Sequence, residues 1–120
     1  MRIAEAAELT GLNISTIRFY EKSGLCPVIK RGSDGNRQFS VTDTDWLLLL
    51  ASLRATRMSL ANMRTFAALY ASGDKTVSQR KFALVKHRQS LEDRQAELDR
   101  CRAILDRKLK IYDQILENQG

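Results

Sequence analysis

The side chains best suited to bind another molecule lie on one side of a short predicted helix near the N-terminus. They are polar, basic or aromatic, and they are Ser15, Thr16, Arg18, Phe19 and Lys22. At about 100° per residue they fall together, while Ile14 and Ile17 face the other side. Arginine and lysine bind phosphate, and guanidinium and hydroxyl groups also bind base edges. The pattern is typical of a helix that lies in a groove of DNA.

A second set of basic and polar side chains surrounds a tight-turn signal. Asp34-Gly35 favours a type I′ turn, because glycine tolerates the positive φ that this turn demands. Val28-Ile29 and Phe39–Val41 are short β-like segments on either side, so residues 28–41 predict a β-hairpin, which we call the wing. The basic and polar side chains on or near its tip are Lys30, Arg31, Asn36 and Arg37.

Two short helices would present the groove-facing side chains. Residues 2–10 have helical spacing of apolar residues, and Gly11 is placed to end the helix. Asn13 is a good N-cap for a second helix from Ile14 to about Lys22. Helix, tight turn and helix together predict a helix-turn-helix.

A second helix pair is predicted after the wing. Ser40 and Asp43 resemble a capping box and open a third helix that runs to about Ala55. Ser59 caps a fourth helix over residues 60–72, which Gly73 ends.

The remainder predicts one long helix from Thr76 to about Glu117, with no glycine or proline. Apolar residues recur every seven positions and are joined by others near the end: Leu84, Leu91, Leu98, Leu105, Leu109, Tyr112 and Leu116. Residues 1–73, which we call the head, are too few to cover such a stripe. The heptad pattern therefore predicts a coiled coil. Companion positions such as Arg88 and Gln95 are polar, which favours antiparallel pairing, or packing partly on the head of another subunit.

These elements predict an all-α fold with a small β wing. Residues 1–73 would form a winged helix-turn-helix DNA-binding domain, and residues 74–120 a dimerisation helix in an antiparallel coiled coil. The net charge is +6. Basic residues concentrate in residues 18–37 and 54–64, as a phosphate-binding surface requires.

Composition argues against several other classes of protein. No apolar run approaches the roughly 20 residues of a membrane span, and no signal-peptide pattern is present. Two cysteines form no disulfide framework, which favours the cytoplasm. We find no nucleophile–base pair, paired carboxylates or phosphate loop, so we expect no enzyme activity and no cofactor.

Several motifs resemble those of MerR-family transcription regulators, in order along the whole chain. They are Ile3–Gly11 (IAEAAELTG), Thr16–Glu21 (TIRFYE), Gly24-Leu25 and Asn36–Ser40 (NRQFS), followed by the long helix. The resemblance implies a homodimer on double-stranded promoter DNA, with a pseudo-palindromic site whose spacer is too long. It also implies that the protein distorts the DNA to realign the elements read by RNA polymerase, and that it is nucleoid-associated when bound.

The resemblance also implies roles for single residues. Ser15, Thr16, Arg18 and Phe19 would contact the groove, and Tyr20 would offer its hydroxyl to phosphate. The wing residues Lys30, Arg31, Asn36 and Arg37 would contact the DNA backbone, as would Arg57 beside the helix N-terminus at Ser59. Alternatively, Arg18 pairs with Glu21 or Glu5, and Tyr20 belongs to the core. The family often has tyrosine at the positions of Phe19 and Asn36, and these two substitutions remove a hydroxyl or a ring from the DNA side.

The residues that could sense a signal in such a protein are its cysteines and its one histidine. Cys26, His87 and Cys101 are scattered, so we expect no metal site. The chain resembles the short aldehyde- and thiol-stress branch of the family, which commonly has a cysteine where Ser52 stands. Cys101 is either a small core residue or a redox-reactive thiol, and Cys26 is interpreted as structural.

One alternative function remains at this point. The protein could be an adaptor that binds another protein through its coiled coil, with the basic head incidental.

Overall fold

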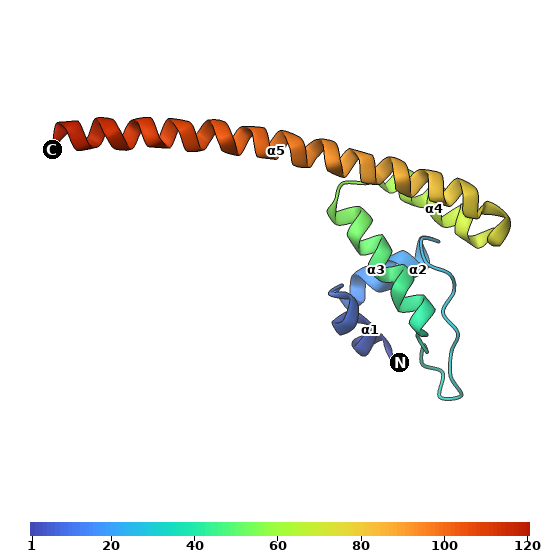
Figure 1. Cartoon of the computed structure of the whole chain (residues 1–120). Helices are drawn as coiled ribbons and strands as arrows, with labels where there is room; N and C mark the ends of the chain where they lie inside the picture. Colours follow the sequence, from blue (N-terminus) through green and yellow to red (C-terminus); the bar gives the residue numbers. More distant parts are fainter. The chain divides into compact units, whose positions relative to one another are not determined.

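The computed structural model describes all residues, 1–120, and divides into two compact units, Met1–Ala83 and Leu84–Gly120. The elements are α1 (Ile3–Thr10), α2 (Ile14–Lys22), α3 (Val41–Ala55), α4 (Leu60–Ala71), a 3₁₀ turn η1 (Asp74–Thr76) and α5 (Val77–Gln119) (Figure 1). The predicted helical fold with a long C-terminal helix is confirmed. None of these helices has the length and apolar character needed to cross a membrane.

Helix ends follow the local signals of the sequence. Gly11 has a left-handed backbone (φ 73°) and its N–H donates to the carbonyl of Ala7, which ends α1. Ser40 and Asp43 form the full capping box at the start of α3, each side chain accepting from the other's backbone N–H. The Ser59 side chain accepts from the backbone N–H of Asn62 at the start of α4. The predicted limits of these helices are therefore confirmed.

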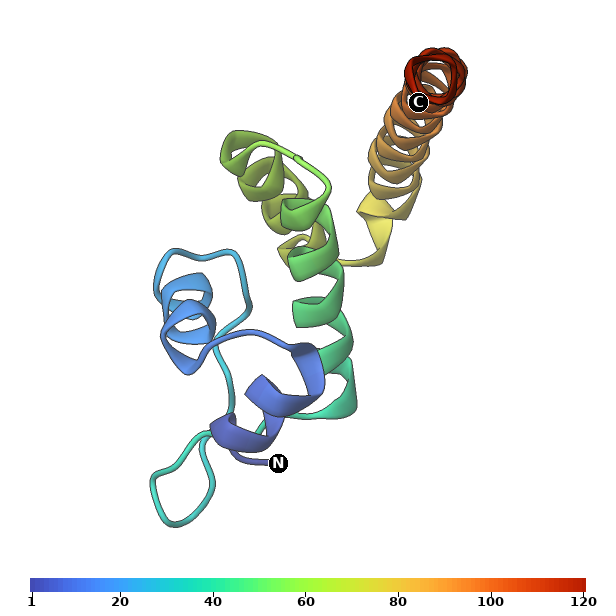
Figure 2. The same ribbon diagram turned by 90° about the vertical axis from the view of Figure 1, so that its left-hand side faces the viewer.

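The core of the first unit lies where α1 packs on both α2 and α3, and where α3 packs on α4. Figure 2 shows α1 beside the lower part of α3 and α2 next to α1, with the loop after α2 descending past them. Leu25, Leu47, Leu50 and Met63 are fully buried. Trp46 joins the parts: its ring stacks on Tyr70 with centroids 4.0 Å apart, and its Nε1 donates to the carbonyl of Leu25 at 2.8 Å. The segment that follows α2 is thus connected to α3 and α4 through one side chain.

The wing differs from the prediction in two respects. Val28-Ile29 and Phe39–Val41 do not pair as strands, and a single antiparallel bridge joins Arg31 and Arg37. The reason is that their backbone groups have other partners. The N–H of Ile29 donates to the Glu21 carboxylate, and Phe39 exchanges two hydrogen bonds with Met1. The predicted β wing is therefore a hairpin-shaped loop without a sheet.

The turn at the wing tip is also of another type. Gly32 and Asn36 close the loop, with the Gly32 N–H donating to the Asn36 carbonyl at 2.8 Å, and the Gly35 N–H donates to the Gly32 carbonyl at 3.0 Å. Gly35 has φ 81°, whereas Asp34 has no positive φ. A type I′ turn needs positive φ at both central residues, so Asp34-Gly35 is not such a turn. The three-residue loop places only its last residue, the glycine, in the left-handed region.

The helix α5 begins at Val77, directly after η1, and continues unbroken to Gln119. No residue of α5 is buried within a single chain. The start of α5 belongs to the first compact unit, Met1–Ala83. There, Arg80 donates to the Thr76 hydroxyl and the Gly73 carbonyl and lies over the Tyr70 ring, 5.3 Å from its centroid.

Candidate nucleic-acid interface

The two sides of α2 have different surroundings. Ile17 and Tyr20 are buried, with 1% and 5% of their surface exposed. On the other side, Ser15, Arg18 and Lys22 are exposed, Phe19 is half exposed and Thr16 is partly exposed. Burial of Ile17 fixes the rotation of α2, so the polar and basic side is turned to solvent.

The cations on α2 have no competing anion in the chain. Arg18 and Lys22 form no ion pair, so the alternative in which Arg18 pairs with Glu21 or Glu5 does not occur. A guanidinium with all its donors in solvent can bind a phosphate or the acceptor edge of guanine. Arg18 therefore has the exposure that its predicted role requires.

Tyr20 does not lie on this exposed side. Its ring is in the core, beside the tilted ring of Phe19 at a centroid distance of 6.1 Å. The structure favours the core alternative for this residue, since only a small part of its surface remains for a partner.

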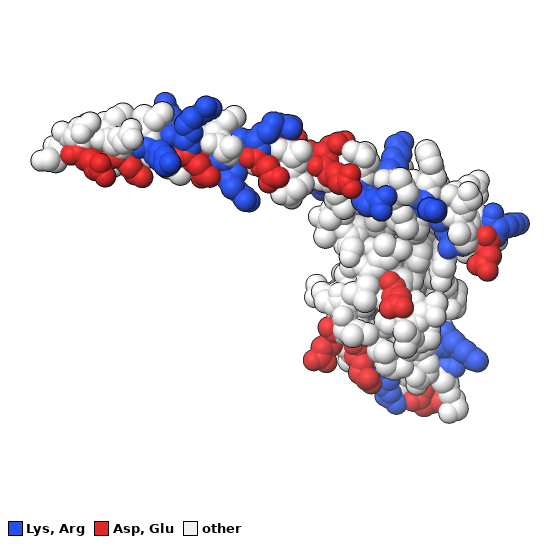
Figure 3. Space-filling view, in the orientation of Figure 1, with Lys and Arg blue, Asp and Glu red and all other residues white.

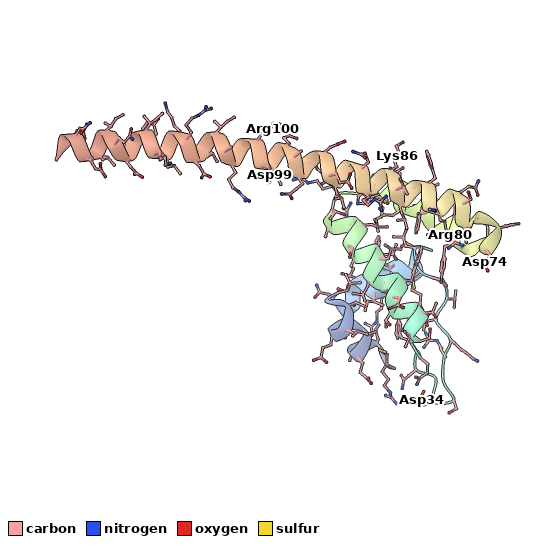
Figure 4. All side chains as sticks on the ribbon, viewed as in Figure 1. Asp34, Asp74, Arg80, Lys86, Asp99 and Arg100 are labelled. Carbon is pink, nitrogen blue, oxygen red and sulfur yellow. The ribbon has the colours of Figure 1, made fainter.

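The tip of the wing is held by its own hydrogen bonds. Asp34 accepts from the backbone N–H and the side-chain amide of Asn36, and it pairs with Arg2 at 2.6 Å. The Asn36 N–H is the main cause that lowers the pKa of Asp34, so this carboxylate stays charged. Arg31 donates to the carbonyl of Gly35 at 2.7 Å. Figure 4 shows Asp34 at the end of the loop.

The other predicted wing residues differ in what they contact. Lys30 and Asn36 are exposed, and Lys30 forms no ion pair. Arg37 is partly buried, and its Nε donates to Oε1 of Glu21 at 2.8 Å. The same carboxylate accepts from the Ile29 N–H at 3.1 Å through Oε2. Arg37 is therefore part of the attachment of the wing to α2.

Arg57 lies in the turn between α3 and α4. It is exposed and has φ 75°, the one non-glycine residue with a positive φ. Arg57 is two residues before Ser59, the N-cap of α4, and the free backbone N–H groups at the start of this helix favour anions. This placement is compatible with the predicted phosphate contact.

The two cysteines have opposite surroundings. Cys26 is buried, and burial, with smaller contributions from Asp43 and Glu21, raises its pKa to about 12. Such a thiol is unreactive near neutral pH. Cys101 is exposed in the single chain. No group of three histidine, cysteine or acidic side chains is placed to hold a metal ion.

Sequence reasoning missed two residues that organise this surface. Glu21 connects α2 to both sides of the wing, and Trp46 connects the end of α2 to α3. The available signal for Glu21 was an acidic side chain on the isoleucine side of an otherwise basic helix. Its partners could not be read from spacing, because Ile29 and Arg37 are distant in sequence.

Comparisons with known proteins agree with this geometry. Residues 1–69 match a family described as MerR HTH family regulatory protein. An uncharacterized HTH-type transcriptional regulator of Haemophilus influenzae is 38% identical over 91% of this chain and 81% of its own length. The Bacillus subtilis regulator AdhR is 35% identical over 76% of this chain and 65% of its own length.

Two solved structures share the fold. A putative MerR family regulator from Listeria monocytogenes has a TM-score of 0.84 and 34% identity, covering 94% of this chain and 86% of that one. HiNmlR, described as a MerR family regulator lacking the sensor domain and bound to promoter DNA, has a TM-score of 0.82 and 37% identity. Its alignment covers 94% of this chain and 90% of that one.

Proposed function

This chain belongs to the MerR family of helix-turn-helix regulators and is a DNA-binding transcriptional regulator, and from that premise we propose how it engages its promoter. It acts as a homodimer that places two copies of α2 and the wing on a pseudo-palindromic site. Each α2 enters a major groove with Arg18 and its exposed neighbours, and each wing contacts the adjacent backbone. The bound dimer distorts the spacer and so controls access by RNA polymerase in the cytoplasm.

One observation carries this proposal. A relative 37% identical, aligned over nearly the whole chain, was solved on promoter DNA. In this chain the corresponding kind of surface, the polar side of α2, is exposed, basic and free of internal ion pairs. The adaptor alternative is not favoured, because the family is one of helix-turn-helix regulators and a relative was solved on promoter DNA.

Exposed apolar side chains of α5 support the homodimer. Leu98, Leu105, Leu109, Tyr112 and Leu116 are each more than half exposed in a single chain. Single exposed leucines are ordinary, but a continuous stripe of this length calls for a partner. A second α5 supplies the same stripe, and antiparallel pairing matches apolar stretches while tolerating the polar companion positions.

Charge supports packing of the end of α5 on the head of the other subunit. Residues 111–120 contain Asp113 and Glu117 and no basic residue. Figure 3 shows white and acidic side chains at this end of the helix. Residues 46–73, which include α4 and most of α3, contain three arginines and no acidic residue. The two surfaces are complementary, and an antiparallel dimer would bring one toward the other.

The test is promoter binding by an Arg18→Ala variant. We expect its affinity for the DNA upstream of its own gene to fall about tenfold or more in a gel-shift assay, since one specific arginine contact contributes roughly 1–3 kcal/mol. Arg107→Ala, which removes the same charge from an exposed position on α5, is the matched control and should bind nearly as wild type.

Two outcomes would count against the proposal. Equal binding by Arg18→Ala and wild type would remove α2 as the reading helix. A wild-type chain that fails to shift this DNA even at low salt, where phosphate contacts are strongest, would instead favour the adaptor function.

A further inference from the structure

The last turn of α2 and the wing are joined by one carboxylate. Oε2 of Glu21 accepts from the backbone N–H of Ile29 at 3.1 Å, and Oε1 accepts from Nε of Arg37 at 2.8 Å. Ile29 lies on the side of the loop that leaves α2, and Arg37 on the side that returns to α3. Glu21 therefore holds both sides of the wing at once.

No other side chain of α2 forms a hydrogen bond with this loop. The loop has no sheet, and a single bridge joins its two sides. The loop also bonds to the residues before α1, through Phe39 and Gln38 on Met1 and through the exposed pair of Arg2 with Asp34. Ile29 and Phe39 are buried in the core as well. Glu21 is thus the side chain of α2 whose hydrogen bonds hold the wing.

The ion pair of Glu21 with Arg37 is less exposed to solvent than the other ion pair of the chain, Arg2 with Asp34. The side chains of Glu21 and Arg37 are 15% and 24% exposed, against 42% and 60% for Asp34 and Arg2. Partial exclusion of water strengthens a charge-assisted hydrogen bond. It also makes loss of one partner more costly, because the other charge is left unpaired.

Arg37 keeps part of its guanidinium available. Only Nε is bonded within the chain, and neither terminal nitrogen has a hydrogen-bond partner there. A guanidinium is a rigid fork, so fixing Nε also fixes the direction of the two terminal N–H₂ groups. Phosphate oxygens are the natural acceptors for such a fork on a DNA-binding surface.

We infer that Glu21 is a positioning residue for DNA recognition, which holds the wing in register with α2 and orients the Arg37 guanidinium toward a backbone phosphate. This deepens the proposed function and rests on it. It assigns to Glu21 an indirect role, exerted through Arg37 and Ile29, with no contact of its own to DNA. It also reconciles the internal ion pair of Arg37 with the DNA contact expected of that residue.

The first experiment is Glu21→Gln, studied as the full-length chain on its promoter. One amide oxygen cannot replace two carboxylate oxygens, because the amide N–H₂ must face one of the two donors. We expect binding to be weaker by about tenfold or more, because one charge-assisted contact is disturbed in each of two subunits. In hydroxyl-radical footprinting, protection of the backbone beside the wing should be lost, while the backbone that flanks the groove entered by α2 stays protected.

Salt dependence provides a second readout that a purely structural role would not change. Each lost phosphate contact lowers the slope of log affinity against log salt by about 0.9, so a dimer should lose roughly 2. The matched control is Glu8→Gln, the same carboxylate-to-amide change at an exposed residue of α1 that forms no ion pair. It removes the same negative charge but has no contact with the wing, and we expect binding within about twofold of wild type.

A second variant keeps the test decisive if Glu21→Gln folds poorly, as judged by circular dichroism. Arg37→Lys keeps the positive charge that pairs with Glu21. The lysine ammonium lacks the planar guanidinium, so once it is bonded to Glu21 it has no terminal N–H₂ groups directed at phosphate. It should fold as wild type and lose the same backbone protection. A wild-type footprint and salt slope in Arg37→Lys, or in folded Glu21→Gln, would overturn the inference.

The inference and the proposed function can fail separately. If Glu21 has no positioning role, the wild-type chain still protects the groove and Arg18→Ala still weakens binding. If the proposed function is wrong, wild type gives no footprint at all.

Discussion

The two compact units of this chain treat their apolar side chains in opposite ways. In Met1–Ala83, residues from four helices and the loops between them share one core, with Leu25, Leu47 and Leu50 fully buried. In Leu84–Gly120, no side chain is buried, and the leucine stripe lies open. The comparison teaches that the head is stabilised by contacts within its own chain, whereas no contact within the chain buries the stripe on α5, which is the observation behind the proposed dimer.

The same contrast holds for local signals. The helices of the head are short, and each is bounded by a cap or a glycine, because the chain must turn back to build a core. The helix α5 has no internal stop signal, and its order depends on one repeated spacing. The head is therefore specified by many different interactions and the tail by one kind.

The largest expected effect is in the head, at Trp46. Trp46→Ala removes the ring stacked on Tyr70 and Phe66 and leaves the Leu25 carbonyl without its donor. We expect the free energy of unfolding to fall by about 3–5 kcal/mol, measured by urea denaturation followed by circular dichroism. Trp46→Phe keeps a ring but loses the indole N–H, and should lose about 1–3 kcal/mol. A loss below about 1 kcal/mol for the alanine variant would mean that this stack does not hold the head together.

In the second unit, Leu84–Gly120, we expect a smaller change in the free energy of unfolding but a larger effect on promoter binding. Leu105→Lys with Leu109→Lys places two charges in the proposed helix pairing. Light scattering should show monomers at micromolar concentration, and promoter affinity should fall roughly 100-fold, because two linked half-site contacts become independent. The near-ultraviolet signal of Trp46 should persist, since the head has its own core.

The control for this pair lies on the other side of α5. Gln114→Lys is about half a helical turn from the Leu105 face and should leave the dimer intact. Monomeric wild-type protein, or a dimer that survives both lysines, would contradict the role of the stripe.

The smallest expected effect is a difference in reaction rate between the two thiols, one in each compact unit. At pH 8, a thiol reagent such as DTNB should react quickly with Cys101 and slowly with Cys26, whose pKa is raised to about 12 by burial, Asp43 and Glu21. Unfolding in urea should make both react. Rapid native reaction at Cys26, identified by mass spectrometry, would show that the head opens easily.

The same shift has a pH dependence of stability with a definite sign. Above its ordinary pKa of 9.0, the unfolded Cys26 thiol loses its proton while the folded one keeps it. The unfolded state then binds fewer protons, so stability falls as pH rises from about 9 toward 12 and is retained below that range. Cys26→Ala should remove this contribution in urea titrations at pH 8 and pH 10.5. An identical alkaline decline in the variant would assign it to other groups.

Sequence alone determined the parts of this protein that depend on neighbouring residues. Gly11, the Ser40 capping box and Ser59 set helix limits because their signals act within one turn. The spacing of Ile14 and Ile17 determined which side of α2 faces solvent, and the leucine series determined the length and stripe of α5. Family motifs such as Thr16–Glu21 added the class of partner.

Tertiary structure decided what depends on atoms brought together from distant positions. Phe39 pairs with Met1, so the wing has no sheet, and Glu21 binds Ile29 and Arg37, so Arg37 has an internal partner. Tyr20 enters the core although the sequence left its position open. Helical and heptad periodicities state which side a residue faces, whereas hydrogen bonds require that donor and acceptor meet within about 3 Å, which only the folded chain determines.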